Sequence, residues 1–185
     1  RLNLSQVALG VQYALVINSN AGLWGYHIGD TVKFVSIDPY RLIVTGRVKH
    51  FISAFGEHVI GEEVEAAMLQ VADEMNASIV EFTVAPYIAQ DEGKSYHEWL
   101  VEFERPPSDM ALFKSKLDQA MCAKNVYYQD LIAGNILAPL VLTVVPKNAF
   151  IDYMKSEGKL GGQNKVPRLS NDRKIADALR NQLGK

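Results

Sequence analysis

The sequence has 185 residues, of which 48% are hydrophobic and 22% charged, with a formal net charge of −2. This is enough apolar material for one sizeable core or two small ones. The small net charge gives no overall attraction to nucleic acid or anionic lipid, so neither is an expected partner. The single cysteine, Cys122, excludes an internal disulfide, and it lies in an apolar helical pattern, where we expect a small buried hydrophobe.

No segment has the pattern of a membrane span, a signal peptide or a lipidation site. The longest apolar run, residues 136–145, is about half of a span and contains Pro139. We therefore expect a cytoplasmic protein with no membrane partner. The chain opens at Arg1 without an initiator methionine and runs directly into a strand-like pattern, which suggests truncation upstream.

Residues 1–46 predict a small antiparallel β unit. Apolar residues occupy every odd position from Val7 to Ile17, and this period of two indicates one or two half-buried strands. A turn and two further strands follow, at residues 18–22, 31–36 and 41–45. No helix is available to cover the core of this unit, so its edge is expected to meet more protein.

After Gly46 the pattern changes to helices and strands. Val64, Met68, Val71 and Met75 are spaced by four, three and four residues, which predicts an amphipathic helix. The expected elements are helices at 62–75 and from Ser108 to about 123, strands at 79–85, 98–104 and 140–145, a helix at 148–157, and a last helix capped by Ser170, with Ile175, Leu179 and Leu183 on its apolar face.

These elements predict an α/β (α+β) fold. A small antiparallel β unit, residues 1–46, is followed by a compact two-layer domain of mixed sheet and helices, residues 47–185. The sequence contains no motif typical of a metal site or of a hydrolase. The histidines lack metal-ligand spacing and no G-x-S-x-G elbow occurs, so we predict no metal site made by this chain alone.

The glycine-rich segment 158–165 ends in Lys165. It does not match a phosphate-binding loop, because Val166 follows the lysine and no strand precedes the segment. Two interpretations remain open. The segment is a flexible surface loop with a solvated lysine, or it delivers a mobile lysine to an anionic group.

Three further segments have both a structural and a functional interpretation. Asp30 follows Gly29 at a strand edge and either satisfies a turn or accepts hydrogen bonds from vicinal hydroxyls such as those of ribose. The charged segment 46–49 is a plain domain boundary or a hinge. Gly56 either shapes a turn or permits close approach of a ligand.

The order and spacing of these segments resemble the adenylate-forming superfamily, which contains acyl-CoA synthetases, peptide-synthetase adenylation domains and luciferases. The resemblance rests on residues 25–30, 46–49, Gly56-Glu57, the acidic helix start and Lys165. Within the superfamily, residues 20–30 and 161–168 are similar to the auxin-responsive (Gretchen Hagen) acyl-acid amido synthetases, and more to bacterial members than to plant ones. The similarity spans nearly the whole chain.

The resemblance implies the carboxy-terminal part of an ATP-dependent ligase. Such an enzyme activates a small-molecule carboxylic acid as acyl-AMP and transfers the acyl group to an amine, in particular an amino acid. ATP and Mg²⁺ would be its cofactors, both held mainly by a large N-terminal domain outside this chain, so the fragment alone is expected to be inactive. A thioester-forming ligase similar to acyl-CoA synthetases, and a non-catalytic interaction module, are the alternatives.

The resemblance also implies a role for individual residues. Asp30 would hold the ribose hydroxyls, with Tyr26 and Arg47 beside the same nucleotide. Lys165 would bridge the carboxylate and the α-phosphate during adenylation, where two anions meet and a positioned ammonium is valuable.

The same comparison implies two mobile parts. Lys49 matches the hinge about which the small domain rotates, and Gly56 and Glu57 lie in a loop that enters the active site in the second half-reaction.

Overall fold

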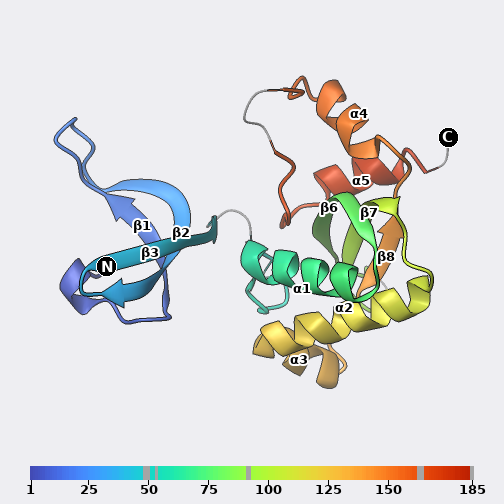
Figure 1. Cartoon of the computed structure of the whole chain (residues 1–185), viewed down its shortest axis with the longest axis horizontal. Coiled ribbons are helices and arrows are strands. Elements are labelled where there is room, and N and C mark those ends of the chain that lie inside the picture. The colour runs from blue at the N-terminus through green and yellow to red at the C-terminus, as the bar shows by residue number, and fades with distance from the viewer. Residues whose placement is uncertain (48–50, 53, 91–92, 162–164, 184–185) are drawn as a thin grey trace.

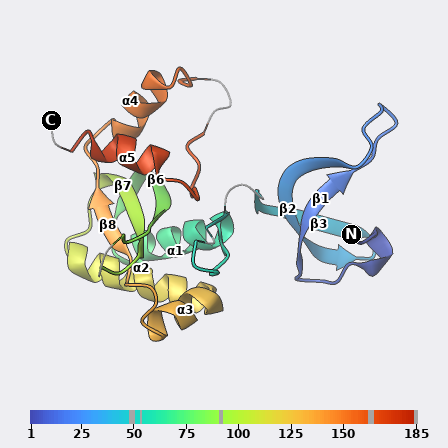
Figure 2. The same cartoon turned by 180° about the vertical axis from the view of Figure 1, so that it is seen from behind.

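The computed structural model describes residues 1–185 except 48–50, 53, 91–92, 162–164 and 184–185. Figures 1 and 2 show two bodies joined by one segment. We call residues 1–47 the N-terminal β unit and residues from 51 onward the C-terminal body. The loss of strand pattern after Gly46 therefore coincides with the passage of the chain from one body to the other.

The N-terminal β unit is an antiparallel meander. A short 3-10 helix, Leu4–Gln6, precedes strands β1 (Gln12–Ile17), β2 (Tyr26–Ile37) and β3 (Tyr40–Arg47), which pair in the order β1-β2-β3. The expected antiparallel unit is confirmed. β2 begins five residues before the expected start at residue 31, because Tyr26 and His27 pair with the end of β1.

Few side chains of this unit are buried. Val32 and Phe34 have 1% and 4% of their surface exposed, and Phe34 makes edge-to-face contacts with Tyr13 and Tyr40. Trp24, in the turn between β1 and β2, is 85% exposed. A three-stranded sheet offers two faces and has no helix here to cover either, so many of its apolar side chains meet solvent.

The C-terminal body is built on a mixed sheet. β6 (Ser78–Tyr87) pairs antiparallel with β7 (Tyr96–Arg105), and β7 pairs parallel with β8 (Val141–Val144). β7 is the central strand and its side chains alternate between two faces. Trp99 and Val101 enter one apolar cluster and Leu100 enters the other.

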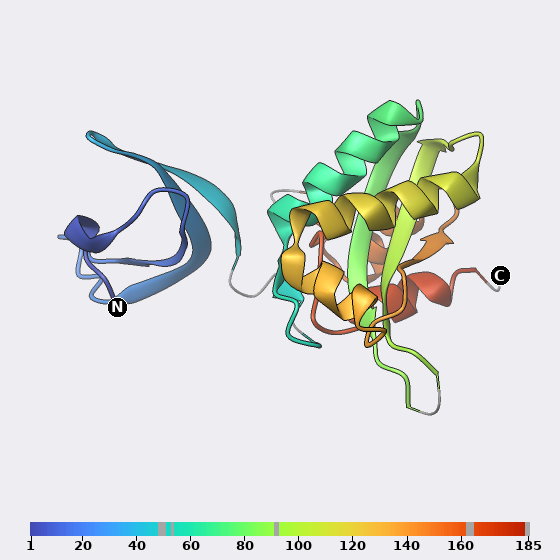
Figure 3. The same cartoon turned by 90° about the horizontal axis from the view of Figure 1, so that it is seen from below.

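Helices cover both faces of this sheet (Figure 3). One face carries α1 (Gly61–Glu74), α2 (Met110–Lys124) and α3 (Val126–Ala133), and the other carries α4 (Ala149–Ser156) and α5 (Lys174–Arg180). The mixed sheet with helices is confirmed, and a second helical layer adds to the two layers expected. It arises because α4 and α5 bury their apolar faces on Leu100 and Val145.

Two predicted helix starts were wrong. α2 starts after Asp109 rather than at Ser108, because the Asp109 carboxylate accepts a hydrogen bond from the Leu112 amide at 2.9 Å. α5 starts after Arg173, because the Ser170 amide donates a hydrogen bond to the Val84 carbonyl and this holds Ser170 in an extended segment. Leu183 is exposed and lies beyond α5, so it is not part of the buried face.

Besides the 3-10 helix Leu4–Gln6, three further elements were not predicted from the sequence. They are α3 and the two-residue strands β4 (Phe51–Ile52) and β5 (Val59–Ile60), which pair with each other. Cys122 is half-buried against the larger cluster, and burial raises the pKa of its thiol. Within the described part of the chain, no helix is long and apolar enough to cross a membrane.

Candidate functional site

β2 and β3 bring two of the predicted site residues directly opposite each other. Asp30 and Arg47, 17 residues apart in the chain, are Cα partners at the end of the β2–β3 ladder. Asp30 is half-buried, and the adjacent pair, Thr31 and Gly46, lies where the register shifts. The Thr45 hydroxyl donates to the Thr31 hydroxyl at 3.1 Å. Asp30 therefore stands at the end of the β unit from which the chain leaves for the C-terminal body.

The backbone around Asp30 is irregular on its other side too. The β1–β2 register breaks between His27 and Thr31, and Gly29 in this break has a φ of +88°. Such a bulge turns the following side chain away from the regular alternation of the strand. Tyr26 lies on the far side of the break, half exposed and paired with Ile17. Tyr26 and Asp30 thus belong to one strand but flank a bulge.

Lys165 has an exposed side chain that lines a groove of the C-terminal body. The groove has a volume of about 240 Å³, and its described lining residues come from β6, β7, α4 and the glycine-rich segment. Asp30 belongs to the other body and does not line it. The structure therefore sets the backbone of Asp30 opposite that of Arg47 and leaves Lys165 in the other body.

The segment after Lys165 is fixed along the outer edge of β6. The Val84 amide donates to the Arg168 carbonyl at 2.9 Å, and the Ser170 amide donates to the Val84 carbonyl at 3.0 Å, which makes a parallel bridge. The Thr83 hydroxyl also donates to the Pro167 carbonyl at 2.7 Å. The lysine thus stands at the start of an anchored strand-like segment.

Arg168 secures the same segment through its side chain. Its guanidinium forms ion pairs with Glu65 of α1, at 2.9 Å, and with Glu81 of β6. It also lies over the Phe82 ring at 4.7 Å. Arg168 belongs to the motif around Lys165, but spacing alone assigned it no role, because its partners lie about 100 positions away in the chain.

The predicted active-site loop connects β4 to β5. Gly56 at its tip is exposed and has a φ of +91°, a conformation that favours glycine. Glu57 is the opposite case, because its side chain is fully buried. Its carboxylate accepts hydrogen bonds from His97 Nε2 and from the Phe55 amide, both at 2.8 Å. Burial raises the pKa of the Glu57 carboxyl, but these hydrogen bonds prevail and leave it below the ordinary 4.5.

Lys49, the predicted hinge, lies outside the described residues, and its role stays a prediction. Near this boundary the start of α1 approaches the end of β3, and Lys33 Nζ is 3.8 Å from Glu62 Oε2. A cleft of about 440 Å³ opens here between the two bodies, lined by residues that include Gly10, His58 and Glu63.

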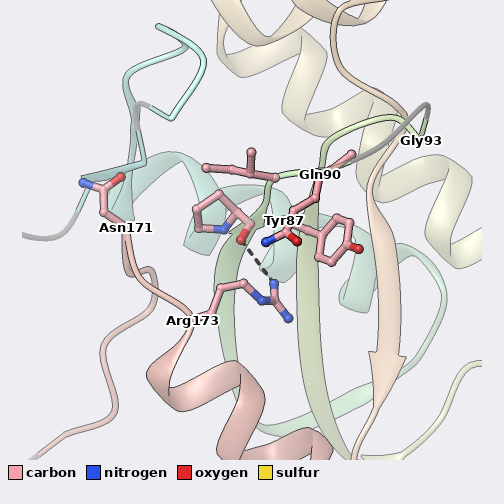
Figure 4. A pocket seen from close by; sticks show the side chains of 8 residues that line it. Tyr87, Gln90, Gly93, Asn171 and Arg173 are labelled. Carbon is pink, nitrogen blue, oxygen red and sulfur yellow. Dashed lines mark hydrogen bonds between the residues drawn. The ribbon is translucent and has the colours of Figure 1, made fainter.

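A larger open pocket of about 750 Å³ lies where the β6–β7 hairpin meets the segment before α5 (Figure 4). Arg173 lines this pocket. Its guanidinium donates hydrogen bonds to the Pro86 carbonyl at 3.1 Å and to Glu98 at 2.7 Å, and forms an ion pair with Asp177. The charge of Arg173 is therefore compensated within the fold. The described residues that line this pocket include none of the predicted site residues. Over the same described residues, no group of three His, Cys, Asp or Glu side chains could hold a metal ion.

Both bodies of the chain match domains of one known protein family. The profile of the "GH3 family C-terminal domain" matches residues 62–174, and that of the "GH3 family central domain" matches residues 1–47. The chain belongs to the GH3 family. The resemblance to the auxin-responsive (Gretchen Hagen, GH3) family inferred from the motifs is thereby confirmed, and the greater similarity to its bacterial members stays a prediction.

Two curated relatives are plant proteins from Arabidopsis thaliana. "Probable indole-3-acetic acid-amido synthetase GH3.1" is 28% identical over 96% of this chain and 32% of its own length. "Indole-3-acetic acid-amido synthetase GH3.3" is 28% identical over 90% of this chain and 30% of its own length. The chain thus spans about a third of the length of these relatives.

A solved structure has the same fold. "GH3.15 acyl acid amido synthetase" superposes with a TM-score of 0.75 at 19% sequence identity, covering 98% of this chain and 35% of that chain. At this identity the similarity establishes the arrangement of strands and helices, and the roles of individual residues need their own tests.

Proposed function

We propose that this chain is part of a longer ATP-dependent acyl-acid amido synthetase. In the first half-reaction a substrate carboxylate oxygen attacks the α-phosphorus of ATP, forming acyl-AMP and releasing pyrophosphate. In the second, an amine nitrogen attacks the acyl carbon, the bond from that carbon to the phosphate oxygen breaks, AMP leaves and the amine loses a proton. The names of the relatives suggest indole-3-acetic acid as one acid to test.

One observation carries this proposal. The two bodies of the chain match, in order, the central and C-terminal domains of a single family of which the relatives are amido synthetases. We assign residues 1–46 to the end of the large adenylating domain and residues 47–185 to the small domain that closes on it, with the hinge near residues 47–49.

The geometry supports distinct roles for the N-terminal β unit and the C-terminal body. The Asp30 carboxylate accepts hydrogen bonds only, which suits the vicinal hydroxyls of a ribose, and Arg47 opposite it adds a positive charge for the same nucleotide. Tyr26 would contact the nucleotide from across the bulge. The chemistry of these groups fits ATP, whereas no described cluster fits Mg²⁺, so we assign no residue of this chain to the metal.

Lys165 would act from the small domain. An ammonium group between the carboxylate and the α-phosphate lowers the repulsion of the two anions in the transition state. It must then withdraw so that the amine can approach, and its position on a separate body allows this through domain rotation about Lys49. The loop that carries Gly56 would then enter the site.

The test uses the full-length ligase with ATP, a panel of acids (indole-3-acetic, benzoic and hexanoic acid) and the twenty amino acids. Pyrophosphate exchange reports adenylation, and mass spectrometry identifies the product. An amide product supports the proposal. A coenzyme A thioester formed in preference to any amide would contradict it, as would the lack of exchange with every acid. The 185-residue chain, assayed in parallel, is expected to show no exchange.

A further inference from the structure

The loop between β4 and β5 is fixed to the C-terminal body by a buried charged contact. Glu57 in the loop and His97 in β7 have 0% and 1% of their side-chain surface exposed, and their Oε1 and Nε2 atoms are 2.8 Å apart. The second carboxylate oxygen of Glu57 accepts the Phe55 amide at 2.8 Å. A single side chain therefore ties both the loop backbone and the sheet to one point.

His97 is a rigid support for this contact. It lies in the central strand of the mixed sheet, paired with Pro86 of β6. Its ring lies beside that of Tyr128, with 5.3 Å between the ring centroids. The Tyr128 hydroxyl donates to Asp118 at 2.7 Å, and the Leu140 amide donates to the same carboxylate oxygen at 3.0 Å. The ring that flanks His97 is thus itself held by α2 and the approach to β8.

The other end of the loop has a second anchor. The Glu63 carboxylate at the start of α1 accepts the Ile60 amide and the Asn125 side-chain amide, both at 3.0 Å. Gly56 lies between Phe55 and Glu57, the two loop residues that the first anchor joins. It is exposed, and a Cβ built on it would meet nothing within 4 Å. The residues on both sides of Gly56 are therefore held in place while Gly56 itself faces open space.

We propose that Glu57 and His97 are positioning residues for acyl transfer to the amine. Their contact sets the geometry with which the tip at Gly56 meets the acyl-adenylate. This inference rests on the proposed function, which places that loop in the second half-reaction. A misplacement of about 1 Å in a positioning group lowers the rate by up to about a hundredfold. The segment that follows Lys165 is held by different partners, on the edge of β6, so we expect adenylation not to depend on this contact.

Removing one partner alone would leave an uncompensated buried charge and risk unfolding. The main variant is therefore the double replacement Glu57→Met and His97→Leu in the full-length ligase, which substitutes apolar side chains of similar volume for both. Adenylation is measured by pyrophosphate exchange. Transfer is measured with preformed acyl-adenylate of the panel acid that the parent uses, under single-turnover conditions. Thermal unfolding confirms that each variant folds.

We expect the double variant to keep pyrophosphate exchange within about threefold and to lose transfer by about ten- to a hundredfold. His97→Gln, whose amide still donates to Glu57, is expected to recover part of that loss. The matched control is Glu74→Gln, which removes the exposed ion pair between α1 and Lys116 and should leave both steps unchanged.

Equal losses in both half-reactions would overturn the inference, as would unchanged transfer in a folded double variant. A double variant that does not fold would also count against it, provided that His97→Gln folds and transfers like the parent. Failure of the proposed function looks different, because the parent itself would then form no acyl-adenylate from any acid of the panel.

Discussion

Arg168 follows Lys165, the lysine proposed to act in adenylation, by three positions. Its guanidinium lies 2.9 Å from the Glu65 carboxylate of α1. The same guanidinium pairs with Glu81 of β6. Because α1 and β6 pack in one apolar cluster, this contact fixes the segment after Lys165 relative to both. The backbone bridge between Val84 and Leu169 fixes the same segment to β6.

Arg168→Leu is therefore expected to slow adenylation by about tenfold, because the segment that presents Lys165 loses one of its anchors. Pyrophosphate exchange by the full-length ligase measures this effect, and transfer from preformed acyl-adenylate should change little. Arg105→Leu is the matched control, since Arg105 also anchors a chain segment, at Asn76, but far from the lysine in the chain. A similar loss in both variants would indicate a general effect on folding.

Lys165→Ala should lower adenylation by about a hundred- to a thousandfold, the usual effect of removing a group that stabilises transition-state charge. The Lys165 side chain is exposed, so the unfolding temperature should stay the same. Lys159 lines the same groove and pairs with Glu157 at 3.9 Å, which makes Lys159→Ala a control for loss of positive charge there. Adenylation that survives Lys165→Ala would remove this residue from the mechanism.

Asp30→Asn tests the nucleotide side of the proposal. An amide keeps the size of the carboxylate but loses the charge and one acceptor, so hydrogen bonds to ribose hydroxyls weaken. We expect KM for ATP to rise by about tenfold, the effect of losing a charge-assisted hydrogen bond, with a smaller change in kcat. Steady-state exchange kinetics at varied ATP concentration give both constants. A change in KM for the carboxylic acid alone would place Asp30 elsewhere in the site.

The parts of the fold that could be predicted are those with a periodic apolar pattern. The spacing of Val64, Met68 and Val71 predicted α1 because these side chains share one buried face. β4 and β5 are two residues long and have no period to detect. α3 was missed because Asn125 is both the C-cap of α2 and the N-cap of α3, so no Gly or Pro marks the boundary.

The candidate site divides in a similar way. Motif order led us to predict roles for Asp30, Arg47 and Lys165, and these roles stay predictions. The register that sets Asp30 opposite Arg47 depends on long-range strand pairing. Glu57 was expected in an active-site loop, and its buried contact with His97, 40 residues away, has no local signal. Contacts between distant segments are set by packing, which a single sequence does not display.

Lys49→Pro tests the hinge, the part of the proposal that lies outside the described residues. Proline fixes φ and removes a backbone donor, so rotation of the small domain about this position should be restricted. We expect adenylation to persist and acyl transfer to fall by at least about tenfold if rotation must precede transfer. The two half-reactions are measured separately, as above, and equal losses in both would argue against the hinge.

Glu98 should make the stability of the C-terminal body depend on pH. Its buried carboxylate accepts hydrogen bonds from Arg173 and Arg180, both at 2.7 Å, and from Thr143 at 2.6 Å. Burial raises the pKa of the Glu98 carboxyl, but these donors prevail and leave it below the ordinary 4.5. A lowered pKa in the folded state adds stability above the unfolded value, and this stability is lost as the pH falls from 4.5 through the folded value.

Glu98→Gln is accordingly expected to lower the free energy of unfolding at neutral pH by about 2 to 3 kcal/mol, less than for a fully buried pair because Arg180 is partly exposed. The variant should also show a weaker pH dependence than the parent between pH 5 and about pH 3. Urea unfolding of the 185-residue chain across this range measures both. The control is Glu74→Gln, because Glu74 pairs with Lys116 at the surface and its loss should leave the stability nearly unchanged. Parallel pH profiles for the parent and Glu98→Gln would show that this carboxylate is not the titrating group.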